Sequence, residues 1–325
     1  MKKWLVLLLT VSTLLLLGLL SALPAAANGS SNTYYVSPAG SDLGAGSEAS
    51  PWQTLSFAVS EASGEDTILV MDDNDETTVD YQENVIVDKP LTIERYDDVG
   101  PNPQIQAGAP DQHVFDIVVN DVILRGLDIF GATDGGSAAI HLRSTSHCTI
   151  ENNRCGWDET HWNRWGIAFY NSTENILVGN TCSYNKYHGI RLCYSCNNNF
   201  IFLNTLSDNG LSNAFSGGSA STWHSPVPLE YEYDGVTYTN YLGNDYGDYL
   251  GNDADGDGIG DTPYQISIQT DDYPLVDSRS TYVVTGYEPD NPLPEVSTFI
   301  LFGIGMIGLA GYVGYRRVRS AARAS

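Results

Sequence analysis

The chain has 325 residues, with 15 Lys and Arg against 40 Asp and Glu, which gives a formal net charge of −25. This acidic balance argues against nucleic acid as a partner, because phosphate binding needs a basic surface, and five cysteines exclude a dense disulfide scaffold, because an odd number cannot all pair within one chain. Abundant glycine (32 residues) and tyrosine (20 residues), with only 17% charged residues, favour a turn-rich β protein over a helical bundle.

The N-terminal segment has the pattern of a secretory signal peptide. Two lysines precede an apolar run over residues 4–20, and a Pro-Ala-Ala-Ala sequence ends at Ala27. A charged start, an apolar middle and small residues before a cleavage site are the features of such a signal. We therefore expect residues 1–27 to be removed during export through the general pathway, and a retained membrane anchor is the alternative.

One helix and several short strands are expected next. Apolar side chains at Leu55, Ala58, Val59 and Ala62 follow the i, i+3, i+4, i+7 spacing of an amphipathic helix over residues 54–62. Runs rich in Val, Ile and Leu predict strands. These strands are expected at residues 67–70, 84–87, 91–94 and 114–119.

From there the sequence repeats itself, in alternating strands that lead to an asparagine. Asn153, Asn180 and Asn204 mark successive copies, at spacings of 27 and 24 residues. Strands this short cannot bury a face alone, so neighbouring copies must stack. The copies are residues 140–155, 167–182 and 190–206.

The repeat predicts an all-β fold, a right-handed parallel β-helix over residues 33–215. Asparagine tolerates the left-handed backbone conformation of a corner, and stacked amides can hydrogen-bond along the axis. The helix at residues 54–62 would cover the open N-terminal end, which would otherwise expose strand edges. A β-sandwich is the alternative, but it predicts hairpin signals, which are sparse in residues 114–206.

Residues 216–277 are expected to form an acidic, tyrosine-rich closing segment with a calcium-binding loop. Aspartates alternate with glycines in this loop, and such carboxylates can converge on one hard cation. Tyr264 stands where an EF-hand has its bidentate Glu, so the loop is not an EF-hand. We expect a structural Ca²⁺ here, and a solvated acidic loop is the alternative. The predicted ligands are Asp253, Asp255, Asp257 and Asp261.

An aromatic and basic insertion over residues 157–165 lengthens the turn between the first two clear repeats. Stacked coils would place it beside the next turn, which carries residues of the same kinds. Exposed rings pack on the apolar faces of sugars and charged side chains bond hydroxyl groups, so the pattern predicts a carbohydrate-binding surface. The alternative is that the tryptophans cover an edge of the core. The predicted ligand-binding residues are Trp157, His161, Trp162, Arg164, Trp165, Tyr187, His188 and Arg191.

No set of catalytic residues can be assigned from the sequence. His141 and Arg191 should occupy equivalent outward positions two coils apart, with Ala168 between them. A glycoside hydrolase needs an acid and a base that flank the scissile bond, and no such pair lies on the expected strands of residues 140–206. A surface ion pair or a solvated face explains each of these residues as well as a catalytic role does.

The cysteines suggest a different chemistry. Cys182, His188, Cys193 and Cys196 could form a soft-metal set. However, Cys155 and Cys182 occupy the same position of the repeat, which predicts an inward apolar slot, and a buried free cysteine behaves as a small hydrophobe. A second Cys-x-x-Cys sequence, which a zinc-type site would use, is also missing.

The C-terminal region is expected to anchor the protein. Residues 278–293 are interpreted as a linker and residues 296–315 as an uncharged span, which as a helix would be about 30 Å long, enough for one bilayer core. Four arginines follow it within residues 294–325, so this tail should stay cytoplasmic and the main domain outside. A plain single-span anchor is the alternative to a sorting signal.

Four stretches resemble known families. Residues 34–95, with Tyr-Val-Ser-Pro-x-Gly-Ser-Asp and Pro-Trp-x-Thr-Leu, resemble the opening of exported right-handed β-helix proteins. Residues 140–206 resemble the repeats of pectate-lyase-like β-helices and of NosD-type periplasmic proteins of nitrous oxide reductase maturation, and residues 238–275 resemble the closing segment of NosD-like surface proteins. Residues 294–319, which begin with Pro-Glu-x-Ser-Thr, resemble PEP-CTERM sorting signals. This last resemblance implies cleavage by an exosortase-type enzyme and transfer to the cell envelope.

Together these features predict an exported, envelope-anchored β-helix surface protein that binds extracellular glycan or serves structurally. A polysaccharide lyase or glycoside hydrolase is the first alternative, and a NosD-like accessory protein of metal maturation is the second. Because β-helices include lyases, hydrolases, binders and passive surface proteins, the fold does not decide among them.

Overall fold

The computed structural model describes residues 31–73, 75, 78–97, 100–218 and 220–285. Among these residues, no helix is both long enough and apolar enough to cross a membrane. The expected signal peptide at residues 1–27 and the expected sorting signal at residues 294–325, with its span at residues 296–315, lie outside the described residues.

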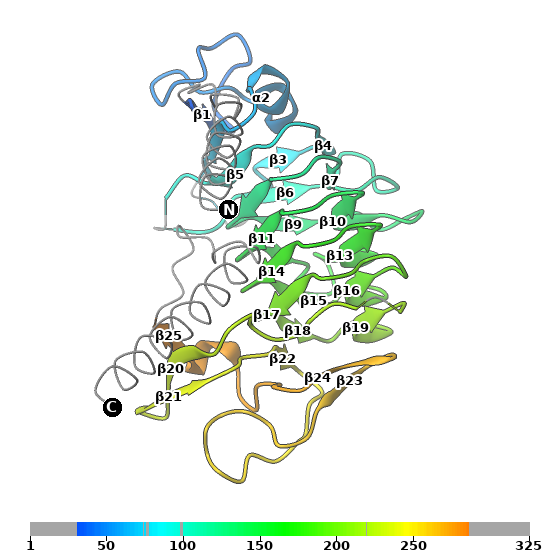
Figure 1. Cartoon of the computed structure of the whole chain (residues 1–325). Helices are drawn as coiled ribbons and strands as arrows, with labels where there is room; N and C mark the ends of the chain where they lie inside the picture. The colour runs from blue at the N-terminus through cyan, green and yellow to red at the C-terminus, as the bar shows by residue number, and fades with distance from the viewer. Residues whose placement is uncertain (1–30, 74, 76–77, 98–99, 219, 286–325) are drawn as a thin grey trace, which may run out of the picture. The chain divides into compact units, whose positions relative to one another are not determined.

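Three parallel β-sheets are built from successive coils of the chain (Figure 1). The first sheet consists of β1 (Thr33–Val36), β2 (Thr67–Val70), β5 (Thr92–Arg95), β8 (Ile123–Arg125), β11 (Thr149–Glu151), β14 (Ile176–Val178) and β17 (Phe200–Phe202). The second sheet consists of β4 (Val85–Val87), β7 (Phe115–Ile117), β10 (Ala138–Arg143), β13 (Trp165–Tyr170), β16 (His188–Leu192) and β19 (Ser212–Ser216). The third sheet consists of β3 (Tyr81–Gln82), β6 (Gln104–Gln106), β9 (Asp128–Phe130), β12 (Arg154–Cys155), β15 (Thr181–Ser183), β18 (Thr205–Ser207) and β22 (Asp245–Tyr246).

The pairing confirms the predicted parallel β-helix. Strands of one coil belong to three different sheets, and each strand pairs in parallel with its equivalent in the next coil. Ile140 pairs with Ile167, which pairs with Ile190, and all three side chains are fully buried. Burial of each such side chain stabilises the folded state by about 1.5–3 kcal/mol. This stabilisation requires that the neighbouring coil is in place.

A buried ladder of asparagines follows one corner of the coils. The Nδ2 atom of Asn153 lies 3.2 Å from Oδ1 of Asn180, that of Asn180 3.0 Å from Asn204, and that of Asn204 2.9 Å from Asn244. The stacked amides predicted from the spacing are therefore present. The left-handed backbone conformation was expected at the ladder asparagines themselves. It is found instead at the residue before the ladder position, as at Asn152 (φ 52°).

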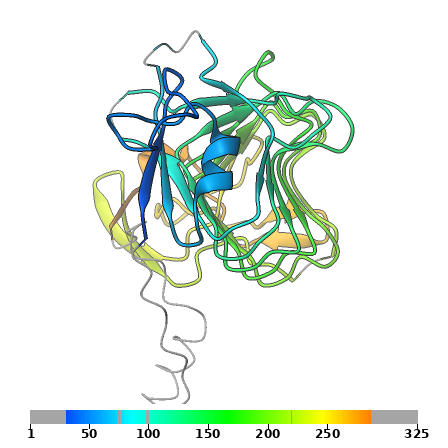
Figure 2. The same cartoon turned by 90° about the horizontal axis from the view of Figure 1, so that it is seen from above.

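Helix α2 (Leu55–Glu61) confirms the helix predicted at residues 54–62. The side chain of Thr54 caps its first turn by accepting a hydrogen bond from the backbone N–H of Phe57 (3.2 Å). At its other end the Lys89 ammonium group donates to three backbone carbonyls. Figure 2 shows α2 lying across the open N-terminal end of the coils, where its apolar face joins the core.

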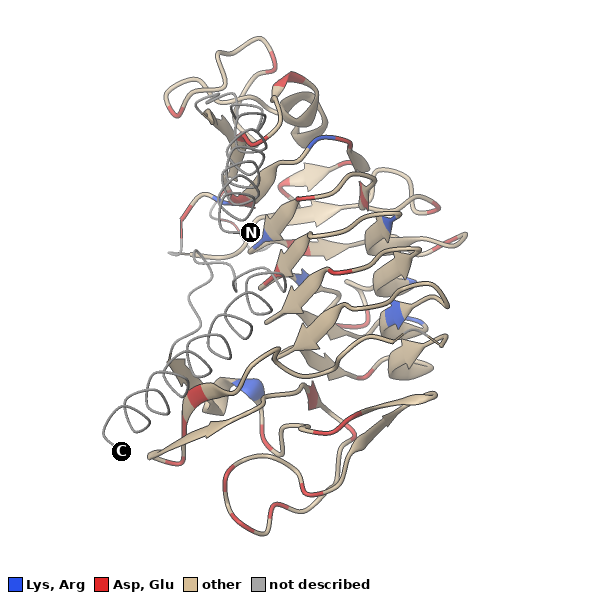
Figure 3. Ribbon diagram, in the orientation of Figure 1, with Lys and Arg blue, Asp and Glu red and all other residues tan. Residues whose placement is uncertain are grey.

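The third sheet continues past residue 215, the expected end of the β-helix. Thr222 bridges in parallel to Phe200 of the first sheet, and β22 pairs in parallel with β18 while Asn244 extends the ladder. Residues 224–242 are therefore inserted within the last coil. Asp and Glu lie along the loops of this closing part of the chain (Figure 3). Its own elements are β20 (Leu229–Tyr233), β21 (Val236–Asn240) and β25 (Val283–Thr285) in one antiparallel sheet, the hairpin β23 (Tyr264–Ile266) and β24 (Gln269–Asp271), and the short helix η1 (Arg279–Thr281).

Candidate functional site

The structure divides the eight predicted ligand-binding residues into two groups. The turn between β12 and β13, residues 156–164, carries members of both groups. Its first half folds back over the third sheet, where the rings of Trp157 and His161 contact Phe130 of β9. Its second half follows the neighbouring turns through backbone hydrogen bonds. The second group is Trp162, Arg164, Trp165, Tyr187, His188 and Arg191, which lie on this half, on the next turn and on the adjoining strands.

Trp157 and His161 line a groove of about 610 Å³ over the third sheet. Their rings stack at a centroid separation of 4.6 Å and an interplanar angle of 11°. Four residues in register on consecutive strands also line this groove, one each from β6, β9, β12 and β15. These are Gln104, Asp128, Arg154 and Thr181. Pro101, Asn102, Asn152, Asn153 and Gly179 complete the lining.

Polar contacts fix the side chains within this groove. The buried carboxylate of Asp128 accepts hydrogen bonds from the Arg154 guanidinium and from Nδ2 of Asn102 (3.0 Å). The same guanidinium lies 4.2 Å from the centroid of the Trp157 ring. The groove therefore combines an ordered aromatic surface with charged and amide groups, and this pairing suits a ligand that has both apolar faces and hydroxyl groups.

Asp158 holds the turn that presents these rings. Its carboxylate accepts hydrogen bonds from the backbone N–H and the hydroxyl of Thr160, and from the backbone N–H and Nδ1 of His161. Slight burial acts to raise the pKa of Asp158, but these hydrogen bonds outweigh it and hold the pKa well below its usual range. The carboxylate is therefore charged at neutral pH and keeps His161 stacked on Trp157.

The second group forms a cluster of cations on aromatic faces. The Arg164 guanidinium lies 4.6 Å from the Tyr187 ring centroid and 5.6 Å from that of Trp165. The Arg191 guanidinium lies 4.8 Å from the same Trp165 ring. Lys186, which the sequence did not single out as a ligand-binding residue, lies 5.9 Å from both Trp162 and Tyr187.

His188 lies at the edge of this cluster. Its Nδ1 atom lies 2.8 Å from the Ser212 hydroxyl, and its ring stacks on Phe215. Burial, with a smaller effect of the nearby Arg191, lowers the pKa of His188 to about 4. The imidazole is therefore neutral at physiological pH.

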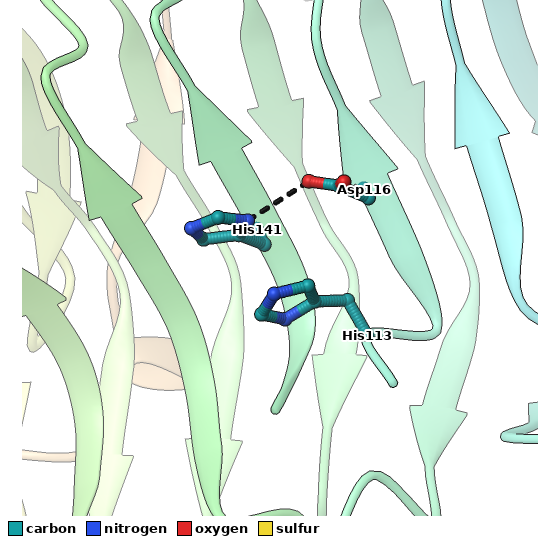
Figure 4. Close-up of side chains that lie close together, drawn as sticks. All are labelled: His113, Asp116 and His141. Carbon is teal, nitrogen blue, oxygen red and sulfur yellow. Dashed lines mark hydrogen bonds and ion pairs between the residues drawn. The ribbon is translucent and has the colours of Figure 1, made fainter. Parts of the chain in front are cut away.

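A further group on the second sheet consists of His113, Asp116 and His141 (Figure 4). The Nδ1 atom of His141 donates to Oδ1 of Asp116 (2.8 Å), and Arg143 donates to Oδ2 (3.0 Å). Burial acts to raise the pKa of Asp116, but these two bonds lower it overall. In a neutral His141 ring that donates from Nδ1, the Nε2 atom would have a free lone pair, which is the arrangement of an oriented general base.

As arranged, the two histidines do not converge on one metal ion. Their rings stack with centroids 4.0 Å apart and an interplanar angle of 16°, so their in-plane lone pairs run nearly parallel. The Nδ1 atom of His113 already accepts the backbone N–H of Ala138 (3.0 Å). Burial, and to a smaller degree His141, lowers the pKa of His113 to about 4, so this ring is neutral.

The outward row predicted on the second sheet is present. Asp116 pairs with His141, His141 with Ala168, and Ala168 with Arg191. The sequence located His141 and Arg191 but missed Asp116 and His113. Asp116 lies on a strand that precedes the clear repeats, so no repeat register pointed to it.

The proposed soft-metal set is not brought together. Cys193 and Cys196 form a disulfide. Cys155 and Cys182 are fully buried in the core, as their repeat position predicts. Desolvation raises the pKa of Cys155 well above its usual value, so it remains a thiol and packs as an apolar side chain.

The acidic loop brings three of its four predicted ligands together. Carboxylate oxygens of Asp253, Asp255 and Asp257 lie within 4.8 Å of one another. Asp261 is outside this group and accepts the backbone N–H of Ala254 (2.8 Å). The neighbouring charge of Asp257 is the main cause that raises the pKa of Asp255. Backbone N–H groups donate to Asp253, so part of its charge is already compensated by the loop itself.

Comparison with known families supports the resemblance found in the repeats. A family model described as "Periplasmic copper-binding protein (NosD)" matches residues 116–251, which is 136 of the 325 residues. The match starts in β7 and ends after β22, so it includes most of the repeats and the insertion in the last coil. The chain is therefore similar to NosD over this region. No curated protein matches the sequence significantly.

Two solved structures are also similar to this chain. One is a rhamnogalacturonan lyase, with 14% identity and a TM-score of 0.34, where the match covers 58% of this chain and 60% of that chain. The other is pectate lyase Pel9A, with 16% identity and a TM-score of 0.36, where the match covers 58% of this chain and 57% of that chain. The chain thus spans less than two thirds of either lyase, and neither likeness bears on activity.

Proposed function

We propose that this protein is an exported, envelope-anchored β-helix that binds extracellular glycan in the groove over the third sheet. The observation that carries the proposal is the stacked Trp157–His161 pair beside the hydrogen-bonded Asp128 and Arg154. Sugars present an apolar ring face and hydroxyl groups that both donate and accept, and this groove offers partners for each. A rigid sheet holds the polar residues in register, which lowers the ordering cost of binding.

The expected location agrees with such a role. The matching family model describes a periplasmic protein, and the segments interpreted as signal peptide and sorting signal would export the chain and hold it at the envelope. An exosortase-type enzyme would be the sorting partner. A glycan-binding β-helix anchored in this way would contact polysaccharide outside the cell.

A glycan array tests the proposal with the full chain in detergent. The wild type should bind a subset of glycans, and Trp157→Ala should lower that binding about tenfold or more, because a ring-stacking surface is lost. Tyr170→Ala is the matched control, since Tyr170 is an exposed aromatic residue on the second sheet. Absence of any glycan binding, or equal losses in the two variants, would contradict the assignment of the groove.

A polysaccharide lyase is a second candidate, supported by the Asp116–His141 pair. In such a reaction the Nε2 atom of His141 would take the proton beside the carboxylate of a uronate, the electron pair would form a C=C bond, and the glycosidic oxygen would leave and take a proton from water. Arg191 lies two strands away, about 10 Å along the axis, where it could face an anionic sugar. A screen of acidic polysaccharides for unsaturated uronates by near-ultraviolet absorbance tests this, with His141→Gln expected to abolish the signal.

We also propose that Ca²⁺ binds the acidic loop and has a structural role. The convergence of Asp253, Asp255 and Asp257 supports it, because Ca²⁺ prefers several oxygen ligands in a flexible geometry. A role in metal maturation has less support, since Cys193 and Cys196 are bonded to each other as a disulfide and Cys182 is buried in the core.

A further inference from the structure

Three cations of this acidic protein differ from all the others that the structure describes. Nine Lys and Arg residues lie in the described ranges. Six of them donate to a protein oxygen: Lys89, Arg95, Arg125, Arg143, Arg154 and Arg279. For Arg164, Lys186 and Arg191, the described residues supply no carboxylate within 4.0 Å.

These three cations lie together rather than apart. Arg164 and Arg191 share the Trp165 ring, and Arg164 and Lys186 share the Tyr187 ring. The Nε atom of Arg164 is buried without a hydrogen-bond partner among the described residues. Arg191 is half-buried, and this burial lowers its pKa. The cluster therefore holds three positive charges that repel one another. Arg164 and Arg191 are also partly buried, and aromatic faces lie against all three cations.

An anion is the partner that would complete this arrangement. A guanidinium group presents a planar fork of N–H donors that matches a carboxylate or a sulfate group in two parallel hydrogen bonds. The rings of Trp162, Trp165 and Tyr187 supply apolar surface beside the charges, which suits a sugar ring. Because a net charge of −25 repels any long polyanion, nucleic acid included, single-stranded DNA serves below as the control for charge alone.

We propose that Arg164, Lys186 and Arg191 form a binding site for an anionic polysaccharide that carries carboxylate or sulfate groups. The site is distinct from the groove over the third sheet, because no residue of the cluster lines that groove. It goes beyond the glycan binding proposed for the groove, and it does not require that the groove bind any ligand.

The test is equilibrium binding of the full chain in detergent to four polymers at low ionic strength: polygalacturonate, dextran sulfate, neutral dextran and single-stranded DNA. We expect tighter binding to polygalacturonate and dextran sulfate than to neutral dextran and DNA, with the affinity falling as salt rises. The Arg164→Gln, Arg191→Gln double variant should weaken binding to the acidic polysaccharides about tenfold or more. A preference for polygalacturonate would assign carboxylate as the recognised group, and a preference for dextran sulfate would assign sulfate.

Two controls separate this site from charge in general and from the groove. Arg125→Gln removes one cation that pairs with Glu94 on the first sheet, and it should leave the affinity unchanged. On a Trp157→Ala background, which alters the groove, the double substitution should cause the same fold loss of affinity as it does in the wild type. Should the double variant fail to fold, as judged by its melting curve, the Arg164→Lys, Arg191→Lys variant keeps the charges and should lose only part of the affinity.

Four results would overturn the proposal. The first is equal affinity for neutral dextran and the acidic polysaccharides. The second is an equal loss in Arg125→Gln and in the double variant. The third is tighter binding to single-stranded DNA than to either acidic polysaccharide. The fourth is a smaller effect of the double substitution on the Trp157→Ala background than on the wild type.

Discussion

Asp271 is the residue at which the asparagine ladder ends, and it is fully buried. Its Oδ2 atom accepts hydrogen bonds from the backbone N–H (2.9 Å) and Nδ2 (3.0 Å) of Asn244 and from the hydroxyl of Tyr246 (3.1 Å). The ladder itself could be predicted, because Asn153, Asn180 and Asn204 recur in the sequence. Its end could not, because Asp271 lies on a hairpin outside the repeat and reaches the axis only through the tertiary fold.

Asp271 should make stability depend on pH. Burial raises the pKa of Asp271 to about 7 in spite of its hydrogen bonds. The pKa of Asp271 is higher in the folded state than in the unfolded state. Its stabilising contribution to the free energy of unfolding is therefore fully present below about pH 4 and is lost as pH rises through about 7. The contribution is on the order of 4 kcal/mol. Denaturant unfolding at a series of pH values should show this loss in the wild type.

Asp271→Asn supplies the control for this pH dependence. The variant cannot titrate at this position, so its free energy of unfolding should change less than that of the wild type between about pH 4 and pH 7. Other groups that titrate in this range, such as Asp80, contribute equally to both proteins. Parallel pH profiles in the two proteins would show that Asp271 stays charged when folded.

Among the elements, helix α2 was the easiest to predict and the 156–164 turn the hardest. The apolar spacing of residues 54–62 suffices for a helix that faces a core. The turn, by contrast, has no periodic pattern, and its aromatic residues divide between two surfaces because Asp158 folds the first half back over the third sheet. The sequence therefore located the aromatic residues without showing that they belong to two sites.

The cap of α2 should contribute measurably to stability. The Thr54 hydroxyl accepts from the Phe57 N–H and donates to Asp42 (2.9 Å). Thr54→Ala removes both bonds and should lower the free energy of unfolding by about 1 kcal/mol. Thr54→Ser keeps the hydroxyl and should lie close to the wild type. Equal stability of wild type and Thr54→Ala in denaturant unfolding would show that the capping bonds have no net effect.

Calcium should raise the melting temperature through the acidic loop. The full chain in detergent is melted in EDTA and in stepwise additions of Ca²⁺ at fixed ionic strength, which keeps general charge screening constant. Extracellular calcium sites often bind at roughly 10⁻⁴–10⁻³ M, so the rise should begin in that range. Asp255→Ala combined with Asp257→Ala should abolish it, and Asp111→Ala, an exposed acid on another loop, should not.

Magnesium distinguishes a calcium site from simple neutralisation of charge. Mg²⁺ demands octahedral geometry and loses its water reluctantly, so it should raise the melting temperature much less than Ca²⁺. Identical melting curves in EDTA and in excess Ca²⁺ would show that residues 253–261 form a solvated acidic loop without a calcium site. An equal effect of both ions would show that the loop has no defined site.

For the molecule as a whole, the repeat predicted the parallel β-helix because identical positions stack and each coil depends on its neighbours. The last coil was not predicted, because the insertion of residues 224–242 separates β22 from the repeat it completes. The groove could not be predicted either. It depends on one outward row of side chains, Gln104, Asp128, Arg154 and Thr181, that come from four coils.

Amide hydrogen exchange can locate a glycan bound in the groove over the third sheet. The full chain in detergent is compared with and without the glycan that binds best on the array. Binding should slow exchange in residues 100–104 and 154–161, which supply most of the groove lining, and leave residues 139–143 on the second sheet unchanged. Protection confined to residues 113–117 and 138–143, or no protection in either groove segment, would contradict binding in the groove.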